Sequence, residues 1–455
     1  MEHTTAQMPR ENKMGVMPVG RLLIQMSLPM MISMLVQALY NVVDSIFVAR
    51  LSEKALTAVS IAFPIQSLMI AFATGTGVGI NALLSMRLGE KKYDDVNKTA
   101  GNGIFLAIAT YILYASVSIA SARVYFVAQT SDQEIIDYGI RYLVICVAGS
   151  IFPLLGITFD RLLQATGRTF YAMISQLTGA ITNIVFDPLL IFGLCGFPKM
   201  GIAGAAAATV LGQILGLIVS VIFNLKKNED ISFNIKFLRP RSRIITGIYK
   251  VGIPSIIMAS IGSLMVFFLN RILGRFSSTA IAVFGVYFKL QSFVFMPIFG
   301  LNNGIVPIIA FNFGARKKSR ILGTMKFGGL AAVLLMSLGT LIFALFPDFL
   351  LGLFNASDEM LHIGRSALRI ISLHFPIAAI CILLTSVFQA LGHGVYSMLN
   401  SIIRQIVVLV PAAWLLSLTG YVNNVWWSFP IAEVSALIVT VIFFIKVYNK
   451  ELAAL

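Results

Sequence analysis

Long apolar stretches, separated by short polar segments, run along almost the whole chain. Each stretch holds about 20 residues or more, which lets a helix cross ~30 Å of hydrocarbon. We therefore predict an all-α polytopic membrane protein. Its membrane helices are expected at about residues 21–49, 55–85, 101–122, 138–160, 168–193, 201–224, 247–272, 280–312, 325–346, 362–390, 397–420 and 426–448. The first, second and eighth of these helices are long enough to tilt or bend.

A polar connection at residues 225–246 is longer than the others and separates six predicted helices from six more. We expect the chain to consist of a cytoplasmic N-terminal tail (1–20), an N-terminal lobe (21–224), a cytoplasmic linker (225–246), a C-terminal lobe (247–448) and a cytoplasmic C-terminal tail (449–455).

The two halves are related in sequence. One constant shift, which places Pro29 on Pro254, aligns the chain with itself without a gap over long stretches. At this shift the matched pairs include Gly75 with Gly300, Gly79 with Gly304, Gly89 with Gly314, Gln164 with Gln389 and Tyr171 with Tyr396. Such a repeat indicates an internal duplication. Because six is an even number, both halves begin on the same side of the membrane. We expect a two-fold axis along the membrane normal and a central cleft, an architecture that suits alternating access.

Composition and charge support this class. The chain is 58% hydrophobic and 12% charged, with a net charge of +15. If the N-terminus is cytoplasmic, the inner segments hold 23 of the 34 Lys and Arg residues and the outer segments hold nine. This bias predicts a multi-pass cell-membrane protein with both termini in the cytoplasm. The basic loops are expected to contact anionic lipid, and we expect no nucleic-acid partner.

Two predicted helices carry a carboxylate at the end of a polar stripe. One face of the first helix holds Ser33, Gln37, Asn41 and Asp44. One face of the fifth holds Ser175, Gly179, the neighbours Thr182 and Asn183, and Asp187. By residue count, both acids lie in the outer half of the membrane. Acids at such a depth are usually functional. The alternative is that Asp187, which precedes Pro188, caps a broken helix.

The repeat places Leu269 opposite Asp44 and Ala412 opposite Asp187. The acids are therefore absent from the second half, and we interpret them as specialisations of the N-terminal lobe.

Five stretches carry a resemblance to a known family. NVVDSIFVARL, GTGVGINALLSMRLGEKK, LLQATGR, NIVFDPLLIFG and GIAGAAAATVLGQ occur in this order, and the chain from about Leu22 to Lys446 resembles the multidrug and toxic compound extrusion (MATE) family. The resemblance implies two lobes of six helices and the export of organic cations or drugs in exchange for H⁺ or Na⁺. It implies no cofactor, and no metal apart from Na⁺ as one of the two candidate coupling ions.

The resemblance also implies which residues bind the coupling ion. They are Asp44, Asn183, Asp187, Ala205 and Thr209. NorM-like members carry further acids on the seventh and tenth helices, whereas this chain has no acid on the seventh and offers His374 on the tenth. This difference favours the DinF-like or MepA-like side of the family.

A substrate cleft is expected between the lobes, for small organic cations or lipophilic drugs, in a protein that works as a monomer. Its candidate residues are Met34, Gln37, Asn41, Ser175, Gln176, Lys289 and Met296. Flexible thioethers and aromatic faces suit flat lipophilic cations.

The other charges within the predicted helices have expected structural roles. We expect Lys289 and Glu433 to pair in the second lobe, with substrate contact as the alternative for this pair. Asp160 and Arg161 are expected to form a solvated or capping pair at the cytoplasmic interface. Arg404 is expected to extend to the inner surface. His374 is expected to be a buried, hydrogen-bonded residue, with a proton relay as its alternative role.

Other functions fit the sequence less well. A flippase for a lipid-linked precursor on a related two-lobe fold is the main alternative, but its cleft should be basic, whereas the clearest cleft-facing charges here are acids. A major-facilitator carrier would usually have a Gly-x-x-x-Asp-Arg-x-Gly loop, which RLGEKKYDD is not. An enzyme is not expected, because the three cysteines are far apart and neither a His/Cys cluster nor a Gly-x-Ser-x-Gly motif is present.

Overall fold

The structure is a computed structural model in which residues 11–354 and 356–455 are described. Regular structure in these ranges is helical. The first half contains α1 (Lys13–Val16), α2 (Val19–Leu51), α3 (Glu53–Gly89), α4 (Tyr93–Gln129), α5 (Gln133–Ala148), α6 (Ile151–Ala165), α7 (Thr169–Phe192), η1 (Leu194–Gly196) and α8 (Ile202–Lys227). The connection to the second half contains the short helix η2 (Ile235–Leu238).

The second half repeats this order with more interruptions. It contains α9 (Ser242–Leu273), α10 (Ser278–Gly314), α11 (Lys318–Leu345), α12 (Pro347–Gly352), α13 (Asp358–Ser372), α14 (Phe375–Ala390), α15 (Gly394–Ile402), η3 (Ile403–Leu409), α16 (Val410–Ser417), α17 (Val422–Val425), α18 (Ser428–Val447) and η4 (Tyr448–Leu452). We call α2–α8 the N-lobe and α9–η4 the C-lobe.

The described residues contain 10 helices that are long and apolar enough to cross a membrane, and up to 12 if two bent pairs are each counted as one span. The pairs are α5 with α6, bent by 43°, and α13 with α14, bent by 46°. The prediction of twelve membrane helices is therefore confirmed. The strongest breaks lie in the fourth and tenth spans, not in the long spans where bending was considered, and α2 continues through Pro29 as one helix.

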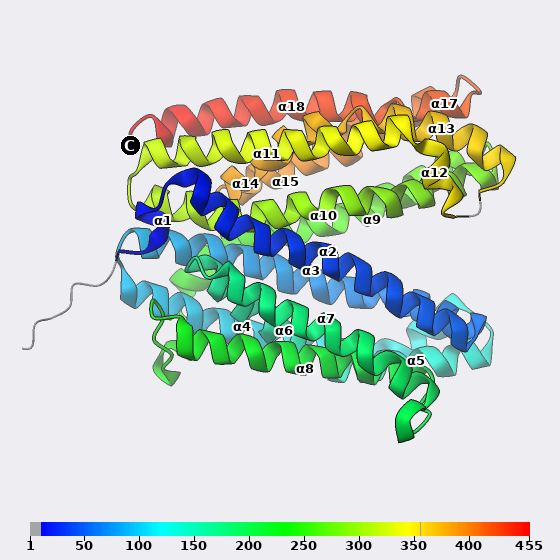
Figure 1. Cartoon of the computed structure of the whole chain (residues 1–455), viewed down its shortest axis with the longest axis horizontal. Helices are drawn as coiled ribbons and strands as arrows, with labels where there is room; N and C mark the ends of the chain where they lie inside the picture. The colour runs from blue at the N-terminus through cyan, green and yellow to red at the C-terminus, as the bar shows by residue number, and fades with distance from the viewer. Residues whose placement is uncertain (1–10, 355) are drawn as a thin grey trace, which may run out of the picture.

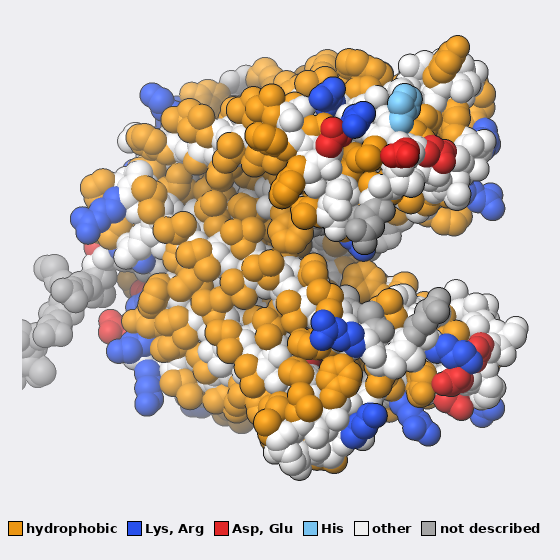
Figure 2. Space-filling view, turned by 45° about the vertical axis from the view of Figure 1, so that its right-hand side comes forward, with side chains coloured by type: hydrophobic (Ala, Val, Ile, Leu, Met, Phe, Trp, Pro, Cys, Tyr) orange, Lys and Arg blue, Asp and Glu red, His pale blue; other side chains and the backbone are white. Residues whose placement is uncertain are grey.

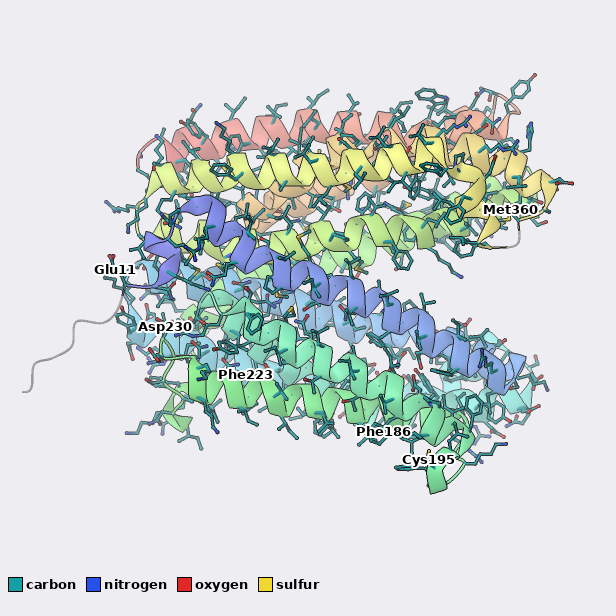
Figure 3. The ribbon with its side chains drawn as sticks, in the orientation of Figure 1. Glu11, Phe186, Cys195, Phe223, Asp230 and Met360 are labelled. Atoms are coloured by element: carbon teal, nitrogen blue, oxygen red, sulfur yellow. The ribbon has the colours of Figure 1, made fainter. Side chains whose placement is uncertain are left out.

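The lobes pack together at one end of the molecule and separate at the other. Across the interface α2 packs on α10, and α3 packs on α9. Glu11, where the described part of the chain begins, and the C-terminus lie at the packed end, which we call the termini side (Figure 1 and Figure 3). At the opposite end, the open side, a notch separates the two lobes (Figure 2).

The internal repeat is visible in the backbone. Ser52 and Ser277 are repeat mates, and both adopt an extended conformation and cap the following helix through the side-chain oxygen. Lys91 and Arg316 are also repeat mates, and both have a positive φ, of 60° and 56°. Residues with side chains rarely adopt this conformation, so its recurrence at equivalent positions shows that the two halves fold alike.

Glycines of the repeat allow the lobes to approach each other. A Cβ atom on Gly75 would lie 2.5 Å from a side-chain atom and 2.8 Å from the backbone nitrogen of Ile256. A Cβ atom on Gly300, its repeat mate, would lie 2.5 Å from the Cα atom of Met31. Met31 and Ile256 are themselves repeat mates, so the two contacts are related by the two-fold axis. Each contact requires a residue without a side chain.

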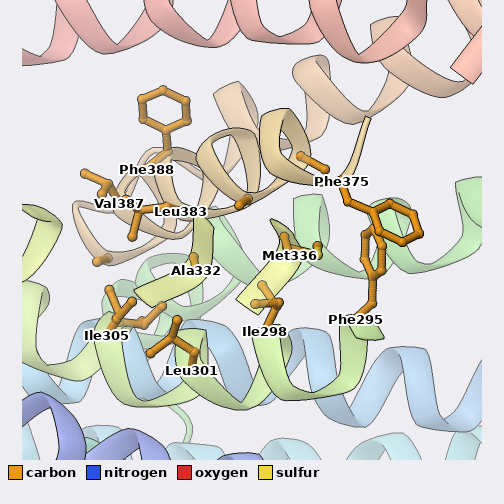
Figure 4. Packing of buried hydrophobic residues seen from close by; sticks show 14 of the residues in the cluster. Phe295, Ile298, Leu301, Ile305, Ala332, Met336, Phe375, Leu383, Val387 and Phe388 are labelled. Atoms are coloured by element: carbon orange, nitrogen blue, oxygen red, sulfur yellow. The ribbon is translucent and has the colours of Figure 1, made fainter. Parts of the chain in front are cut away.

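The largest cluster of buried apolar residues extends through both lobes, and a second cluster lies within the N-lobe. In the C-lobe, Ile298 and Leu301 of α10, Met336 of α11, and Phe375 and Val387 of α14 are buried against one another (Figure 4). Apolar side chains also cover much of the outer surface (Figure 2). Large apolar residues exposed in this way are expected on a surface that contacts lipid hydrocarbon.

Residues Asn12–Met17 join the two lobes on the termini side, and we call this segment the N-terminal bridge. The Nδ2 atom of Asn12 donates to the carbonyl oxygen of Thr166 in the N-lobe at 3.1 Å. On the C-lobe, Arg320 donates to the carbonyl oxygens of Met14 and Met17 at 3.0 and 2.7 Å. The bridge therefore bonds to both lobes where they meet.

Candidate functional site

The two intramembrane acids of the N-lobe lie together. Asp44 belongs to α2 and Asp187 to α7, and these helices pack against each other. The two carboxyl groups lie within hydrogen-bonding reach of each other. Asp187 is completely buried and Asp44 is partly buried. The helical spacing thus predicted the helix face on which each acid lies. The packing of α2 on α7 brings the two acids together.

Asn183 connects the acids to the neighbouring helix α8. Its Nδ2 atom lies 3.4 Å from the Oδ1 atom of Asp187 and 3.3 Å from the Oγ1 atom of Thr209. Thr209 in turn donates to the carbonyl oxygen of Ala205 at 3.0 Å. All five residues that the family resemblance implied are therefore linked through α2, α7 and α8. Their role in ion coupling stays a prediction.

Small residues bring α7 and α8 close enough for this contact. A Cβ atom on Gly212 of α8 would lie 2.6 Å from the carbonyl oxygen of Gly179 and 3.3 Å from the Cβ atom of Asn183. The helices therefore meet almost backbone to backbone. Because α7 continues through Pro188 to Phe192, Asp187 does not cap a helix that ends there.

Three oxygens of this acid cluster are shielded from solvent and have no hydrogen-bond partner among the described residues. They are Oδ1 of Asp44, Oδ1 of Asn183 and Oδ2 of Asp187. A buried polar atom without a partner costs free energy, about 1–3 kcal/mol in proteins. Oxygen atoms alone are the ligands that hard cations prefer. The cluster is therefore suited to binding a proton or a hard cation.

A cavity of ≈ 250 Å³ lies next to the acid cluster inside the N-lobe. Its wall is formed by α2, α3, α6, α7 and α8, with Asn303 added from α10 of the C-lobe. Asn183 and Thr209 line the cavity, whereas Asp44 and Asp187 do not. The carboxyl pair therefore lies behind an amide and a hydroxyl.

The candidate cleft residues separate into two groups. The cavity is lined by Met34, Gln37, Ser175 and Gln176. The lining residues do not include Asn41, Lys289 and Met296. Lys289 lines a different cavity of ≈ 310 Å³ in the C-lobe, where its Nζ atom lies 6.0 Å from the ring centre of Phe354.

A second polar cluster, around Asp160, lies at the other end of the cavity. The Oδ1 atom of Asp160 accepts hydrogen bonds from Ser175 at 2.5 Å and from Ser220 at 2.7 Å, and Oδ2 accepts one from Gln176 at 3.0 Å. Asp160 is only 8% exposed. The expectation of a solvated pair at the cytoplasmic interface was wrong, because α7 and α8 supply three donors and cover the carboxylate.

Arg161 follows Asp160 on α6 and also lines the cavity. Its Nη1 atom donates to Oε1 of Gln164 at 2.9 Å and to Oδ1 of Asn303 at 2.8 Å. These residues were not among the predicted site residues. Four polar residues at positions 158, 160, 161 and 164 of an otherwise apolar helix were the available signal. The position of Asn303 depends on the packing of the two lobes, which local sequence does not show.

The charged residues of the C-lobe pair differently from the prediction. The partner of Glu433 is Arg404, with 3.4 Å between Oε1 and Nη1, and not Lys289. Arg404 does not extend to the membrane surface, because it lies within α15–η3–α16 and turns toward α18. His374 is 5% exposed and its Nδ1 atom lies 2.5 Å from the carbonyl oxygen of Ile371. This agrees with its expected role as a buried, hydrogen-bonded residue.

Two six-span lobes, a notch between them and a polar cavity beside buried acids together define a membrane transporter for small solutes. The chain belongs to the MatE family, because the sequence model of that family matches residues 29–189 and 254–415. The two matches begin at the repeat mates Pro29 and Pro254. Family membership confirms the predicted resemblance, and it places the chain in a family of multidrug efflux transporters and not of enzymes.

Relatives with assigned names agree with this family. The chain is 26% identical over 416 residues to multidrug export protein MepA of Staphylococcus haemolyticus, covering 91% of each chain. It is 27% identical over 423 residues to MepA of Staphylococcus aureus, again covering 91% of each chain. These names agree with the predicted MepA-like side of the family.

Solved structures agree in fold. The structure described as the outward-facing conformation of a multidrug resistance MATE family transporter of the MOP superfamily is 23% identical. It superposes with a TM-score of 0.91 over 99% of this chain and 100% of that chain. This similarity confirms the predicted all-α, two-lobe fold.

Proposed function

We propose that this protein is a secondary active antiporter, which exports cationic or lipophilic organic compounds in exchange for H⁺ or Na⁺ by alternating access. The observation that carries the proposal is the buried contact between Asp44 and Asp187, which has unpaired oxygens and connects to a cavity through Asn183 and Thr209. Two carboxylates in contact repel each other unless a proton or a cation lies between them.

We place both termini in the cytoplasm of a cell-membrane protein, in agreement with the bias of Lys and Arg. The open side then faces the exterior, and the acid cluster, which lies toward that side along α2 and α7, can exchange ions with the external solution. A proton or Na⁺ that enters there neutralises the carboxyl pair. The lobes can then turn without moving an uncompensated charge through hydrocarbon.

Asn183 is the residue that connects ion binding to substrate release in this mechanism. Its amide group donates to Asp187 behind the cavity wall and to Thr209 within it. When an ion occupies the carboxyl pair, Asp187 no longer needs this donor, and the polar surface of the cavity changes. Coupling therefore acts through the amide and not by direct contact between the substrate and the acids.

The available energy is sufficient for active export. A difference of one pH unit supplies ~1.4 kcal/mol per proton. A potential of 100 mV adds ~2.3 kcal/mol for each charge that crosses the membrane. Two such contributions support a concentration ratio of several hundred for a neutral substrate.

The test uses purified protein in lipid vesicles with the fluorescent cation ethidium. A pH gradient and a Na⁺ gradient are imposed separately, and ethidium movement is followed. We expect one of the two gradients to drive transport in the wild-type protein and neither to drive it in Asp187→Asn. Asp137→Asn is the matched control, because Asp137 is an exposed carboxylate on α5. Transport by Asp187→Asn at the wild-type rate would contradict the proposed ion site.

The second candidate in the sequence analysis, a flippase for a lipid-linked precursor, gains no support from the family or from the named relatives. Both are associated with multidrug export. We do not propose it further.

A further inference from the structure

We propose that Arg161 binds an anionic group of the transported compound, so that substrates with an organic carboxylate are preferred over their neutral esters. This inference rests on the proposed function and specifies the substrate class. Asp160 and Arg161 are the charged residues that line the cavity. The properties of these two side chains therefore determine which charged group the cavity can accept.

The carboxylate of Asp160 is already occupied by the protein. Its two oxygens accept the three hydrogen bonds from Ser175, Ser220 and Gln176. It is not within 4.0 Å of a guanidinium nitrogen of Arg161, since the ion pairs among the described residues do not include these two side chains. Asp160 is held by α7 and α8, and its capacity for a further cation is small.

The guanidinium group of Arg161, by contrast, has unused donors. Nη1 donates to two neutral amides, Gln164 and Asn303. The Nε–Nη2 edge has no hydrogen-bond acceptor among residues 11–354 and 356–455. The Nε and Nη2 atoms of Arg161, which have no partner, are also not shielded from solvent. The free edge of the guanidinium is therefore accessible to solvent, in a residue that lines the cavity.

The geometry of this free edge matches a carboxylate. An arginine side chain donates two parallel hydrogen bonds to the two oxygens of such a group, and its charge strengthens both. Arginine is always protonated in proteins, so the charge persists throughout the transport cycle. A neutral ester offers one weak acceptor in place of the anion, and it forms neither the paired bonds nor the charge interaction.

The side chain is also fixed in position before a ligand arrives. A Cβ atom on Gly77 of α3 would lie 2.9 Å from Cγ and 3.3 Å from Nε of Arg161, so the stem of Arg161 packs on this glycine. Gln164 holds the same guanidinium from α6, and Asn303 holds it from the C-lobe. A side chain that is already ordered loses little conformational entropy when it binds a ligand.

The rest of the cavity suits an aromatic compound with a positive group at its other end. Apolar side chains of Met34, Phe152 and Ile157 contribute to the wall. Asn183, which contacts the acid pair, lies eight residues beyond Ser175 on α7, or about 12 Å along the helix. A flat zwitterion can therefore place its anion on Arg161 and direct its cation toward the acid cluster.

The test compares two dyes that differ in one group. Rhodamine B has a free carboxylate, and its ethyl ester has none. Binding to purified wild-type protein is measured by fluorescence anisotropy without any ion gradient. We expect the wild-type protein to bind the free acid more tightly than the ester, by roughly tenfold or more, as a charge-assisted pair allows. Equal affinities for the two dyes would overturn the inference.

Variants then assign the preference to the guanidinium. Arg161→Gln should weaken binding of the acid about tenfold and change ester binding by less than about twofold. Arg161→Lys keeps the charge without the paired donors, and its loss should be intermediate. Arg123→Gln, an exposed arginine on α4, is the matched control and should change neither affinity. An equal loss for both dyes in Arg161→Gln would show a structural role and overturn the inference.

A further variant tests binding if Arg161→Gln does not fold. Asn303→Leu removes the C-lobe partner of Arg161 and leaves the guanidinium in the cavity, so it should retain the preference for the acid. Loss of the preference in Asn303→Leu would argue against binding by the free edge. The wild-type binding ratio does not depend on coupled transport. If the dyes bind with the expected preference but no gradient drives export, the proposed function fails and this inference stands.

Discussion

A methyl group placed on Gly300 should force the lobes apart on the termini side. In the structure, a Cβ atom there would lie 2.5 Å from Cα and 2.6 Å from the backbone nitrogen of Met31 on α2. Carbon atoms in contact prefer a separation of about 3.5–4.0 Å, so α10 and α2 would have to separate by about 1 Å. The neighbouring atoms belong to the backbone, and a change of side-chain rotamer cannot relieve the overlap.

The magnitude follows from a matched substitution in the same helix. Gly285 also lies in α10, and a Cβ atom there would meet nothing within 4 Å. Both Gly→Ala changes gain about 1 kcal/mol from helix propensity, so this contribution cancels in the comparison. Overpacking in a close contact costs about 1–3 kcal/mol. We expect Gly300→Ala to be less stable than Gly285→Ala by this amount.

Each purified variant is heated in detergent, and its thermal unfolding is measured as the fraction of protein that remains monodisperse at each temperature. Gly75→Ala, at the repeat mate of Gly300, should behave like Gly300→Ala because its Cβ atom would lie 2.8 Å from the backbone nitrogen of Ile256. If Gly300→Ala and Gly285→Ala unfold at the same temperature, the lobes are not packed as described. If only one of the two repeat mates is sensitive, the two-fold relation of the contacts is wrong.

Three further predictions concern topology, coupling and the C-lobe. An impermeant maleimide added to intact cells should label the native Cys195, which is exposed on the open side (Figure 3). It should not label a cysteine introduced in the linker by Ser232→Cys. The reverse labelling pattern would invert the topology. Asp44→Asn should bind a cationic substrate weakly and respond to neither a pH nor a Na⁺ gradient in vesicles, and a full response would leave Asp44 a structural role. Glu433→Gln leaves the charge of Arg404 unpaired in the interior, which should reduce the free energy of unfolding by about 3–5 kcal/mol. Replacing both residues by apolar ones should restore most of this free energy. An unchanged denaturation midpoint in Glu433→Gln would contradict the pairing.

The repeat made much of the fold predictable. The shift that relates the two halves of the sequence reappears in the caps at Ser52 and Ser277, and the two bent spans lie at corresponding places in the two lobes. The bends themselves were missed, although a signal was present. Pro153 and Pro376 lie in the first turn of α6 and α14, where proline is favoured because the helix has just begun.

The site was predictable only where helical spacing was sufficient. Asp44 and Asp187 stood out because a carboxylate at that depth is rare and lies on a polar face. The partners of Arg161 and Arg404 could not be predicted, because Asn303 and Glu433 come from other helices. Pairing across helices depends on tertiary packing, which the pattern of one helix does not contain.

In the proposed transport cycle, the N-terminal bridge would give a short segment outside the membrane helices an influence on the opening of the termini side. Its bonds to the N-lobe and to Arg320 coexist only while the lobes meet on the termini side. Opening that side has to break bonds to one lobe, and their free energy becomes part of the barrier. Substitution of Asn12 or Arg320, whose side chains donate these bonds, is thus expected to alter how long the protein rests in this conformation, without touching the cavity or the acids. In the proposed mechanism, the rate of turnover and the choice of substrate would therefore depend on different parts of the chain.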